Sequence, residues 1–446
     1  MKRSRPVDIV TRQIAVVIGD RSKNASVPDA LHGQDGSGPP IAIPDSLPNG
    51  MALPTRYKKL LEYFAKGVLA SLSSHPSVHD DLCRGLMPAM LHSPHLLSAS
   101  LALSAAGLLS RGLSQVEGVS ILRVMEHLQS SGLSLLRQAL AQNQKDEILV
   151  ATCLLWCLAD VFAGQKGIYS WRIHLQGIKA LLQGHQPYQR FTTNTATQAA
   201  MRHLFQLYRS LETLPQLPTL QIPDPSTFLD STASPDNNLA LTPRAKIDGF
   251  LGYSEELLDV LQQISVAPRY DPSSHSALIA QADILLGKLN AMISRDSKAP
   301  PDVSISSTLS PQSDRDYLLC HRTFQQATLI QLYRQLYNMP SSSQPIQSAV
   351  QAISGMVSNM TQGQPCNTWV AMAMPLFTVG CEAFNDDQKS FILDKVDKLE
   401  ECLGSLHVQI IKQALKDIWQ IREDCQDFDG SLCASQLILF VSFFDL

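Results

Sequence analysis

Residues 146–184 read DEILVATCLLWCLADVFAGQKGIYSWRIHLQGIKALLQG, and this stretch carries the strongest indication of the fold. Its first part is a long apolar run, and its second part places apolar residues at three- and four-residue spacing, which is typical of a helix. Gly164 and Gly184 close the two parts, and glycine suits the left-handed end of a helix. The stretch therefore predicts two successive helices.

Helical periodicity continues on both sides of this stretch. It begins after Thr55, runs through residues 57–72, 93–112 and 116–143, and resumes beyond residue 240 up to about residue 424. Strand patterns are nearly absent. The sequence predicts an all-α fold, a large multi-helix bundle or array of antiparallel helices.

Composition divides the chain into a tail and a domain. Residues 1–53 are rich in Gly, Pro, Ser and Asp, which predicts a disordered N-terminal tail. Residues 54–446 then form the helical domain. A Pro-rich loop joins its two halves, 54–212 and 240–446.

The charge balance excludes some classes of protein. The chain has 446 residues and a net charge of −4, with 17% charged and 44% hydrophobic residues, so it is neither disordered throughout nor a basic protein that coats polyanions. No window approaches ~18 uninterrupted apolar residues, and the N-terminus lacks a small-residue cleavage site. We expect a non-secreted protein, nuclear or cytoplasmic, without a membrane partner.

Nine cysteines are scattered along the chain, and no two of them form a C-x2-C pair. This pattern favours reduced thiols over a disulfide framework or a zinc knuckle. Cys153 and Cys157 lie one helical turn apart and have the spacing to share a metal. Because they sit in an apolar run, we interpret them as core residues.

Motifs of common enzymes are missing, including the glycine-rich phosphate loops and the H-E-x-x-H zinc motif. In HPSVHDD, His79, Asp80 and Asp81 are a candidate metal site. The same residues are explained by helix capping, in which an Asp accepts a free backbone N–H. His174 flanks an apolar face, where a buried, hydrogen-bonded histidine is the ordinary interpretation.

Two acidic stretches resemble the metal motifs of terpene cyclases, which hold a Mg²⁺–diphosphate cluster in a helical fold. The residues concerned are Asp386, Ser390 and Asp394 in DDQKSFILD, and Glu423, Asp424 and Asp427 in EDCQD. Both matches are loose, because Asp394 stands where the motif has Glu and the two stretches come in reversed order. They nevertheless leave open an alternative function, a Mg²⁺-dependent sesquiterpene cyclase acting on farnesyl diphosphate.

Residues from about 57 to 425 as a whole resemble the fungal-specific transcription factor domain, an all-helical regulatory region found behind a binuclear zinc-cluster module. The likeness is carried by the order of five segments rather than by one motif. These segments are residues 60–108, the stretch LLWCLADVFAGQKGIYSWRIHLQGIKALL at 154–182, residues 323–340 with 369–384, and LKDIWQIRED at 415–424.

The zinc-cluster module of that family needs six cysteines in two triplets. No cysteine precedes Cys83 in this chain, so we expect no direct sequence-specific DNA contact and no resident cofactor. The resemblance implies a regulator of fungal, secondary-metabolite gene expression that binds protein partners or a small apolar ligand. Whether the chain is instead an enzyme, with Mg²⁺ as its cofactor, stays open.

Overall fold

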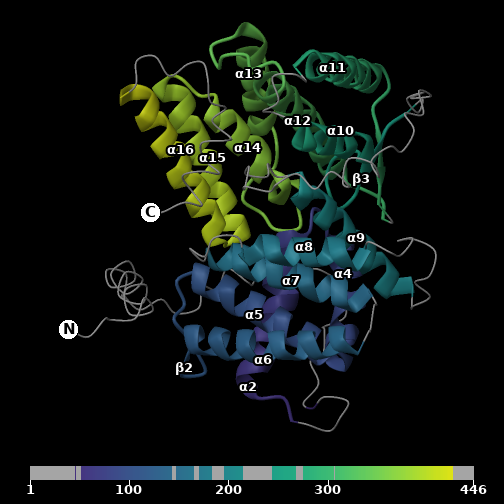
Figure 1. The fold of residues 1–446 in the computed structure, drawn as a ribbon, viewed down its shortest axis with the longest axis vertical. Coiled ribbons are helices and arrows are strands. Elements are labelled where there is room, and N and C mark those ends of the chain that lie inside the picture. Colours follow the sequence, from purple (N-terminus) through teal and green to yellow (C-terminus); the bar gives the residue numbers. More distant parts are fainter. Residues whose placement is uncertain are drawn as a thin grey trace. The chain divides into compact units, whose positions relative to one another are not determined.

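Helices carry almost all of the secondary structure in the described part of the chain (Figure 1). The computed structural model describes residues 46, 52–142, 147–164, 170–182, 195–213, 244–267, 275–305 and 307–424. All of these residues belong to one compact unit, Ile43–Leu446. The predicted all-α fold class is confirmed.

The elements fall into two groups along the chain. The first group is α2 (Thr55–Tyr63), the π-helical segment η2 (Phe64–Val68), α3 (Leu69–Leu72), α4 (Pro76–His92), α5 (Pro94–Ser110), β1 (Gln115–Val116), β2 (Val119–Ser120), α6 (Ile121–Ala141), α7 (Glu147–Ala163), α8 (Ser170–Leu182) and α9 (Thr195–Glu212). The second group is β3 (Lys246–Asp248), α10 (Glu255–Val266), α11 (His275–Lys298), β4 (Asp302–Ser304), α12 (Pro311–Gln335), α13 (Gln344–Ser358), the 3₁₀ segment η5 (Thr368–Ala371), α14 (Ala373–Cys381), α15 (Asp386–Leu403) and α16 (Leu406–Asp424).

Two predictions about organisation fall mainly outside the described residues. Of the predicted tail, the structure describes Ser46, Ala52 and Leu53, and an isolated bridge pairs Ser46 with Ala52. Most of the Pro-rich loop between residues 213 and 240 also lies outside the described part. The division into a tail and two halves stays a prediction.

The apolar run and the periodic segment after it form α7 and α8, as predicted. Almost every residue of α7 is buried, because this helix packs against α5 on one side and α8 on another. Gly164 directly follows α7 with φ of 55°, the left-handed conformation expected of a closing glycine. Gly184 lies outside the described residues.

Helix α5 is the centre of the first group, with α2, α4, α6 and α7 packed around it. Its buried hydroxyls are satisfied within the helix: Ser100 donates to the Leu96 carbonyl at 2.9 Å and Ser104 to the Ser100 carbonyl at 2.8 Å. These bonds let polar residues sit in an otherwise apolar helix without unpaired donors.

Helix α12 has the same role in the second group, with α10, α11, α13 and α14 around it. Helices α14, α15 and α16 pack on one another, and Trp419 of α16 donates its indole N–H to the Gly380 carbonyl of α14 at 2.9 Å. The short strands add two small pairings, β1 with β2 antiparallel and β3 with β4 parallel. The β3–β4 pair forms one wall of a pocket.

Candidate functional site

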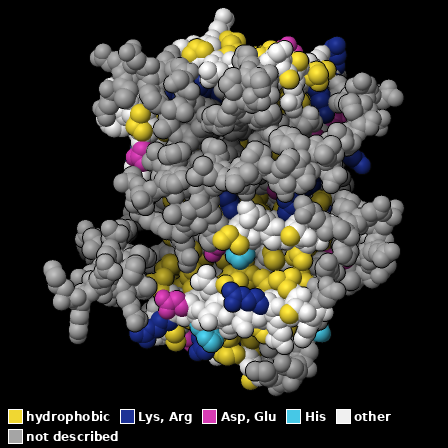
Figure 2. Space-filling model, in the orientation of Figure 1, with side chains coloured by type: hydrophobic (Ala, Val, Ile, Leu, Met, Phe, Trp, Pro, Cys, Tyr) yellow, Lys and Arg dark blue, Asp and Glu magenta, His cyan; other side chains and the backbone are white. Residues whose placement is uncertain are grey.

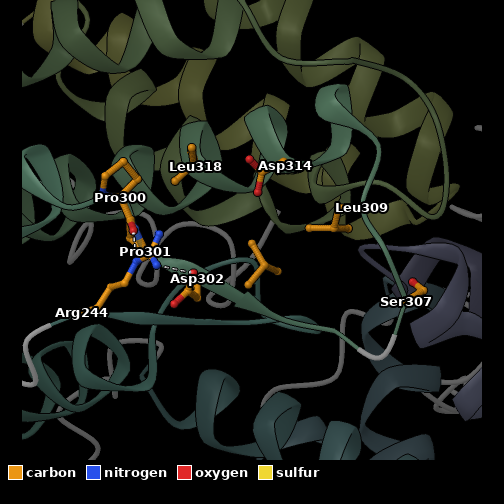
Figure 3. Close-up of a pocket in the computed structure, with 9 residues that line it drawn as sticks. Arg244, Pro300, Pro301, Asp302, Ser307, Leu309, Asp314 and Leu318 are labelled. Carbon is orange, nitrogen blue, oxygen red and sulfur yellow. Dashed lines mark hydrogen bonds and ion pairs between the residues drawn. The ribbon is translucent and has the colours of Figure 1, made fainter.

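A pocket with a volume of about 370 Å³ lies between the β3–β4 pair and the start of α12 (Figure 3). Its lining residues are Arg244, Pro300, Pro301, Asp302, Val303, Ser307, Leu309, Asp314 and Leu318. The pairing of β3 with β4 sets one wall, since it aligns Lys246 with Asp302 and thereby brings Arg244 close to the start of β4. Two residues far apart in sequence are thus fixed side by side by main-chain bonds.

Arg244 is held in this wall by two contacts. Its Nε donates to the Pro300 carbonyl at 2.7 Å, and one of its terminal nitrogens lies 3.0 Å from Asp302 Oδ1. Both charged side chains are about half exposed, at 53% and 58%, so water screens this ion pair. The carbonyl contact and the rigid Pro300–Pro301 pair keep the guanidinium at the pocket wall.

The other wall comes from the first turns of α12. Ser310 is the N-cap residue, and its hydroxyl accepts the Ser313 backbone N–H at 3.1 Å. This cap positions Asp314 in the first turn, where a carboxylate suits the helix dipole, and Leu318 one turn later. Figure 3 shows Asp314 and Leu318 on the α12 side, across the pocket from Arg244 and Asp302.

The lining combines one guanidinium, two carboxylates and the apolar side chains of Leu309 and Leu318. Among the described lining residues, Ser307 alone carries a hydroxyl, and none is a histidine or a cysteine. The arrangement suits a small ligand that carries hydrogen-bond donors or a positive charge together with a short apolar part.

A buried polar network lies deeper in the second group, between α11 and α12. Asp296 Oδ2 lies 3.0 Å from His321 Nε2 and accepts a 2.7 Å hydrogen bond from Gln325 Nε2. The Ser254 backbone N–H donates to His321 Nδ1 at 3.4 Å, so we assign the ring proton to Nε2, which donates to Asp296. The network joins α10, α11 and α12.

This network contains a serine, a histidine and an aspartate, yet it is built for structure. Asp296, His321 and Ser254 are at most 1% exposed. The Ser254 hydroxyl accepts the Leu257 backbone N–H and caps α10. Burial alone would raise the pKa of Asp296, but hydrogen bonds from His321 and Arg295 outweigh it and lower that pKa. The carboxylate therefore stays ionised and holds three helices together.

The turn from Asp248 to Ser254 links the two groups of helices, and the sequence interpretation missed it. Asp248 Oδ1 accepts the backbone N–H groups of Phe250 and Leu251, both at 2.9 Å. The Gly249 carbonyl accepts hydrogen bonds from Tyr317 of α12, at 2.7 Å, and from Ser74 of the first group. The segment GFLGY at residues 249–253, directly before a capped helix, was the signal that could have indicated this turn. Its two glycines lie where other segments of the chain approach the backbone closely.

The first acidic motif lies at the start of α15 in a capping arrangement. The Asn385 side chain accepts the Gln388 backbone N–H at 2.8 Å, and the Gln388 side chain accepts the Asn385 backbone N–H at 3.4 Å. Asp386 follows directly in the first turn, and its side chain is fully exposed. Ser390 is exposed as well, and Asp394 is half exposed and paired with two lysines.

The structure brings Asp386 and Glu423 together, but around a lysine. Lys389 Nζ lies 2.6 Å from Glu423 Oε1 on α16 and 3.8 Å from Asp386 Oδ1. The ammonium offsets one of these two negative charges, which weakens their attraction for a cation. The described residues contain no group of three His, Cys, Asp or Glu side chains that could hold a metal ion. Asp427 and the Asp424 side chain lie outside them, so the Mg²⁺ site stays a prediction.

The HPSVHDD turn caps a helix, but through a different residue from the one expected. Helix α4 begins at Pro76, and His75 is its N-cap, with Nδ1 accepting the Ser77 backbone N–H at 3.1 Å. The prediction of an Asp cap was wrong because Pro76 starts the helix one turn earlier. Asp81 instead pairs with Arg84 at 3.1 Å.

The cysteine interpretation holds for the described residues. Cys153 and Cys157 are buried and free in α7. Burial raises the pKa of Cys153 to about 11 and that of Cys157 further, so both remain protonated core thiols. His174 is largely buried, 3.6 Å from Asp160 Oδ2, and burial lowers its pKa.

Taken together, the described elements define an all-helical domain with a pocket beside the start of α12. A family model described as the fungal specific transcription factor domain matches residues 59–436. The chain therefore belongs to this family, as the resemblance of its segments indicated, and has a transcription-regulator-like role. Neither the curated proteins nor the solved structures contain a match to the chain.

Proposed function

We propose that this chain regulates transcription by binding a protein partner or a small ligand, rather than by contacting DNA through its own described surface. The observation that carries the proposal is the family match over residues 59–436. The net charge of −4 supports it, because neutralising DNA phosphates needs an excess of Lys and Arg. The regulated genes are those of fungal secondary metabolism, and the chain works in the nucleus or the cytoplasm.

The pocket at the start of α12 is where a small ligand binds in this proposal. Arg244 and Asp314 face it from opposite walls, and Leu318 lies beside Asp314 on α12. A wholly apolar ligand would exclude water from these charged groups and offer them no hydrogen bond in return. The pocket therefore favours a metabolite with a polar group and a short apolar part over a plain hydrocarbon.

The test is a complementation experiment in the organism that encodes the chain. Transcripts are sequenced from a deletion strain and from strains complemented with the native chain, the double variant Arg244→Ala/Asp314→Asn, or the control Arg123→Ala. Arg123 is an exposed arginine of α6, remote in sequence from the pocket residues. We expect the deletion to change a set of transcripts, which the native chain and Arg123→Ala restore and the pocket variant does not.

Each part of the proposal has its own contrary outcome. Unchanged transcripts in the deletion strain would contradict the regulatory role. Full restoration by the pocket variant, with the deletion phenotype present, would contradict the pocket and leave the partner surface as the regulatory site. Circular dichroism of the purified variants separates loss of binding from loss of fold.

A further inference from the structure

Helix α11 has an apolar outer face that no other described element covers. Its inner face buries Ala282, Leu285, Leu289 and Met292 against the core. On the outer face Ile284 is 71% exposed, although a side chain of this size is normally buried. Ser276–Lys298 is the one described helical segment long and apolar enough to cross a membrane, with a mean hydropathy of 1.2, yet only 22% of its most apolar window is buried.

The outer face follows a heptad pattern. Its exposed residues alternate at spacings of three and four, which is the seam of a two-stranded coiled coil. The residues of this seam are Ala277, Ala280, Ile284, Gly287, Ala291 and Ser294. A Cβ added at Gly287 would meet nothing within 4 Å, so the chain's own packing does not require glycine there. Small residues at these positions allow a second helix to approach closely.

The charged residues beside the seam indicate which partner helix would bind to it. Asp283 precedes Ile284 and Lys288 follows Gly287, so the two lie five residues apart on opposite edges of the seam. In a parallel pair of identical helices, a residue on the edge where Asp283 lies faces the residue five positions later on the other helix. Asp283 of each copy then meets Lys288 of the other, twice by symmetry.

The alternative orientation is disfavoured by the same charges. In an antiparallel pair each edge faces the same edge of the other copy. The edge of Asp283 otherwise carries Ser276, Asn290 and Ser297, and the edge of Lys288 otherwise carries Gln281 and Arg295, so neither charge can meet an opposite one. Asp283 is already held in place, because Tyr337, two residues after the end of α12, donates a 2.6 Å hydrogen bond to its carboxylate. No described residue forms an ion pair with Lys288, so its ammonium is available to a second copy.

We propose that two copies of this chain form a parallel homodimer through the outer face of α11. This inference goes beyond the proposed function, since it follows from the helix face alone. Figure 2 shows hydrophobic side chains, with basic and acidic ones beside them, at the upper right, where Figure 1 places α11.

The first experiment measures the mass of the full chain by sedimentation equilibrium between about 1 and 100 μM. The variant is Ile284→Glu, which places a carboxylate at the seam centre. Its matched control is Leu140→Glu, another exposed apolar residue, 42% exposed on α6. We expect the native chain and the control to dimerise, and Ile284→Glu to raise the dissociation constant by about 30-fold or more, as for a central interface residue.

The second experiment tests orientation by oxidative cross-linking of Ala277→Cys and Ile284→Cys. In a parallel pair each new thiol faces its own equivalent, so both variants give a cross-linked dimer. The native chain and Ser297→Cys, on the flank of the same helix, are the controls and give none.

Three results would overturn the proposal. One is a monomer for the native chain throughout the concentration range. Another is dimerisation that Ile284→Glu and Leu140→Glu weaken equally. The third is a chain that stays monomeric but sediments with phosphatidylcholine vesicles through Ile284, which would make the apolar face a membrane contact instead.

Discussion

Gly252 in the turn before α10 provides the sharpest test of how the two groups of helices are joined. Its φ is 79°, in the left-handed region, and a Cβ built there would lie 2.7 Å from the Cys320 sulfur of α12. Alanine in this conformation costs about 1–2 kcal/mol. The forced contact in a close-packed core adds about 1–3 kcal/mol. We therefore expect Gly252→Ala to lower the free energy of unfolding by about 2–5 kcal/mol.

Gly363 supplies the matched control for this prediction. Its φ is 71°, almost the same, but a Cβ there would meet nothing within 4 Å. Gly363→Ala should therefore cost only the backbone strain, about 1–2 kcal/mol. Unfolding in urea, followed by circular dichroism at one pH, compares the two variants.

A third variant identifies the source of the difference. Cys320→Ala removes the sulfur, so in its background Gly252→Ala should cost no more than Gly363→Ala does in the native chain. Equal costs for the two single variants would refute the reasoning. So would a cost of Gly252→Ala that does not change when the sulfur is removed.

Three further predictions concern charged groups. The pKa of Asp296 is lower in the folded state than in the unfolded state, so its ionised carboxylate stabilises the fold above the unfolded-state pKa. This stabilisation is lost as the pH falls through the folded-state pKa. Urea unfolding between pH 6 and 3 should therefore show a smaller decline in the free energy of unfolding for Asp296→Asn than for the native chain. Arg334 Nε lies 3.2 Å from Glu382 Oε1, and both side chains are buried. Arg334→Met leaves the Glu382 charge buried without its ion-pair partner, so it should lower the free energy of unfolding by about 3–5 kcal/mol, and adding Glu382→Gln should recover part of that loss. A double variant whose loss equals the sum of the two single losses would contradict this. With Mg²⁺ and farnesyl diphosphate, we expect no hydrocarbon by gas chromatography; a product that disappears in Asp386→Asn would instead establish the cyclase function.

Much of the fold was predictable from the sequence, because a helical pattern repeats over many residues. The apolar run of α7, its closing glycine and the periodic pattern of α8 each repeat the same local signal. The three-residue strands β3 and β4 give no such signal. Their pairing joins Lys246 to Asp302, and a contact at that sequence separation depends on the packing of the helices between them.

The candidate site was less predictable from the sequence for a related reason. What a charged side chain binds depends on its neighbours in space, and the sequence does not show which residues these are. Asp386 and Glu423 have the spacing of metal ligands, and the structure does bring them to the same region. Lys389 then sits between them, so the same two carboxylates become ion-pair partners. Asp296 and His321 show the converse, since neither belongs to a motif and packing alone places them 3.0 Å apart. The spacing of residues along one helix can therefore indicate a candidate site, but the residues that face them determine whether those charges bind a metal ion or form ion pairs.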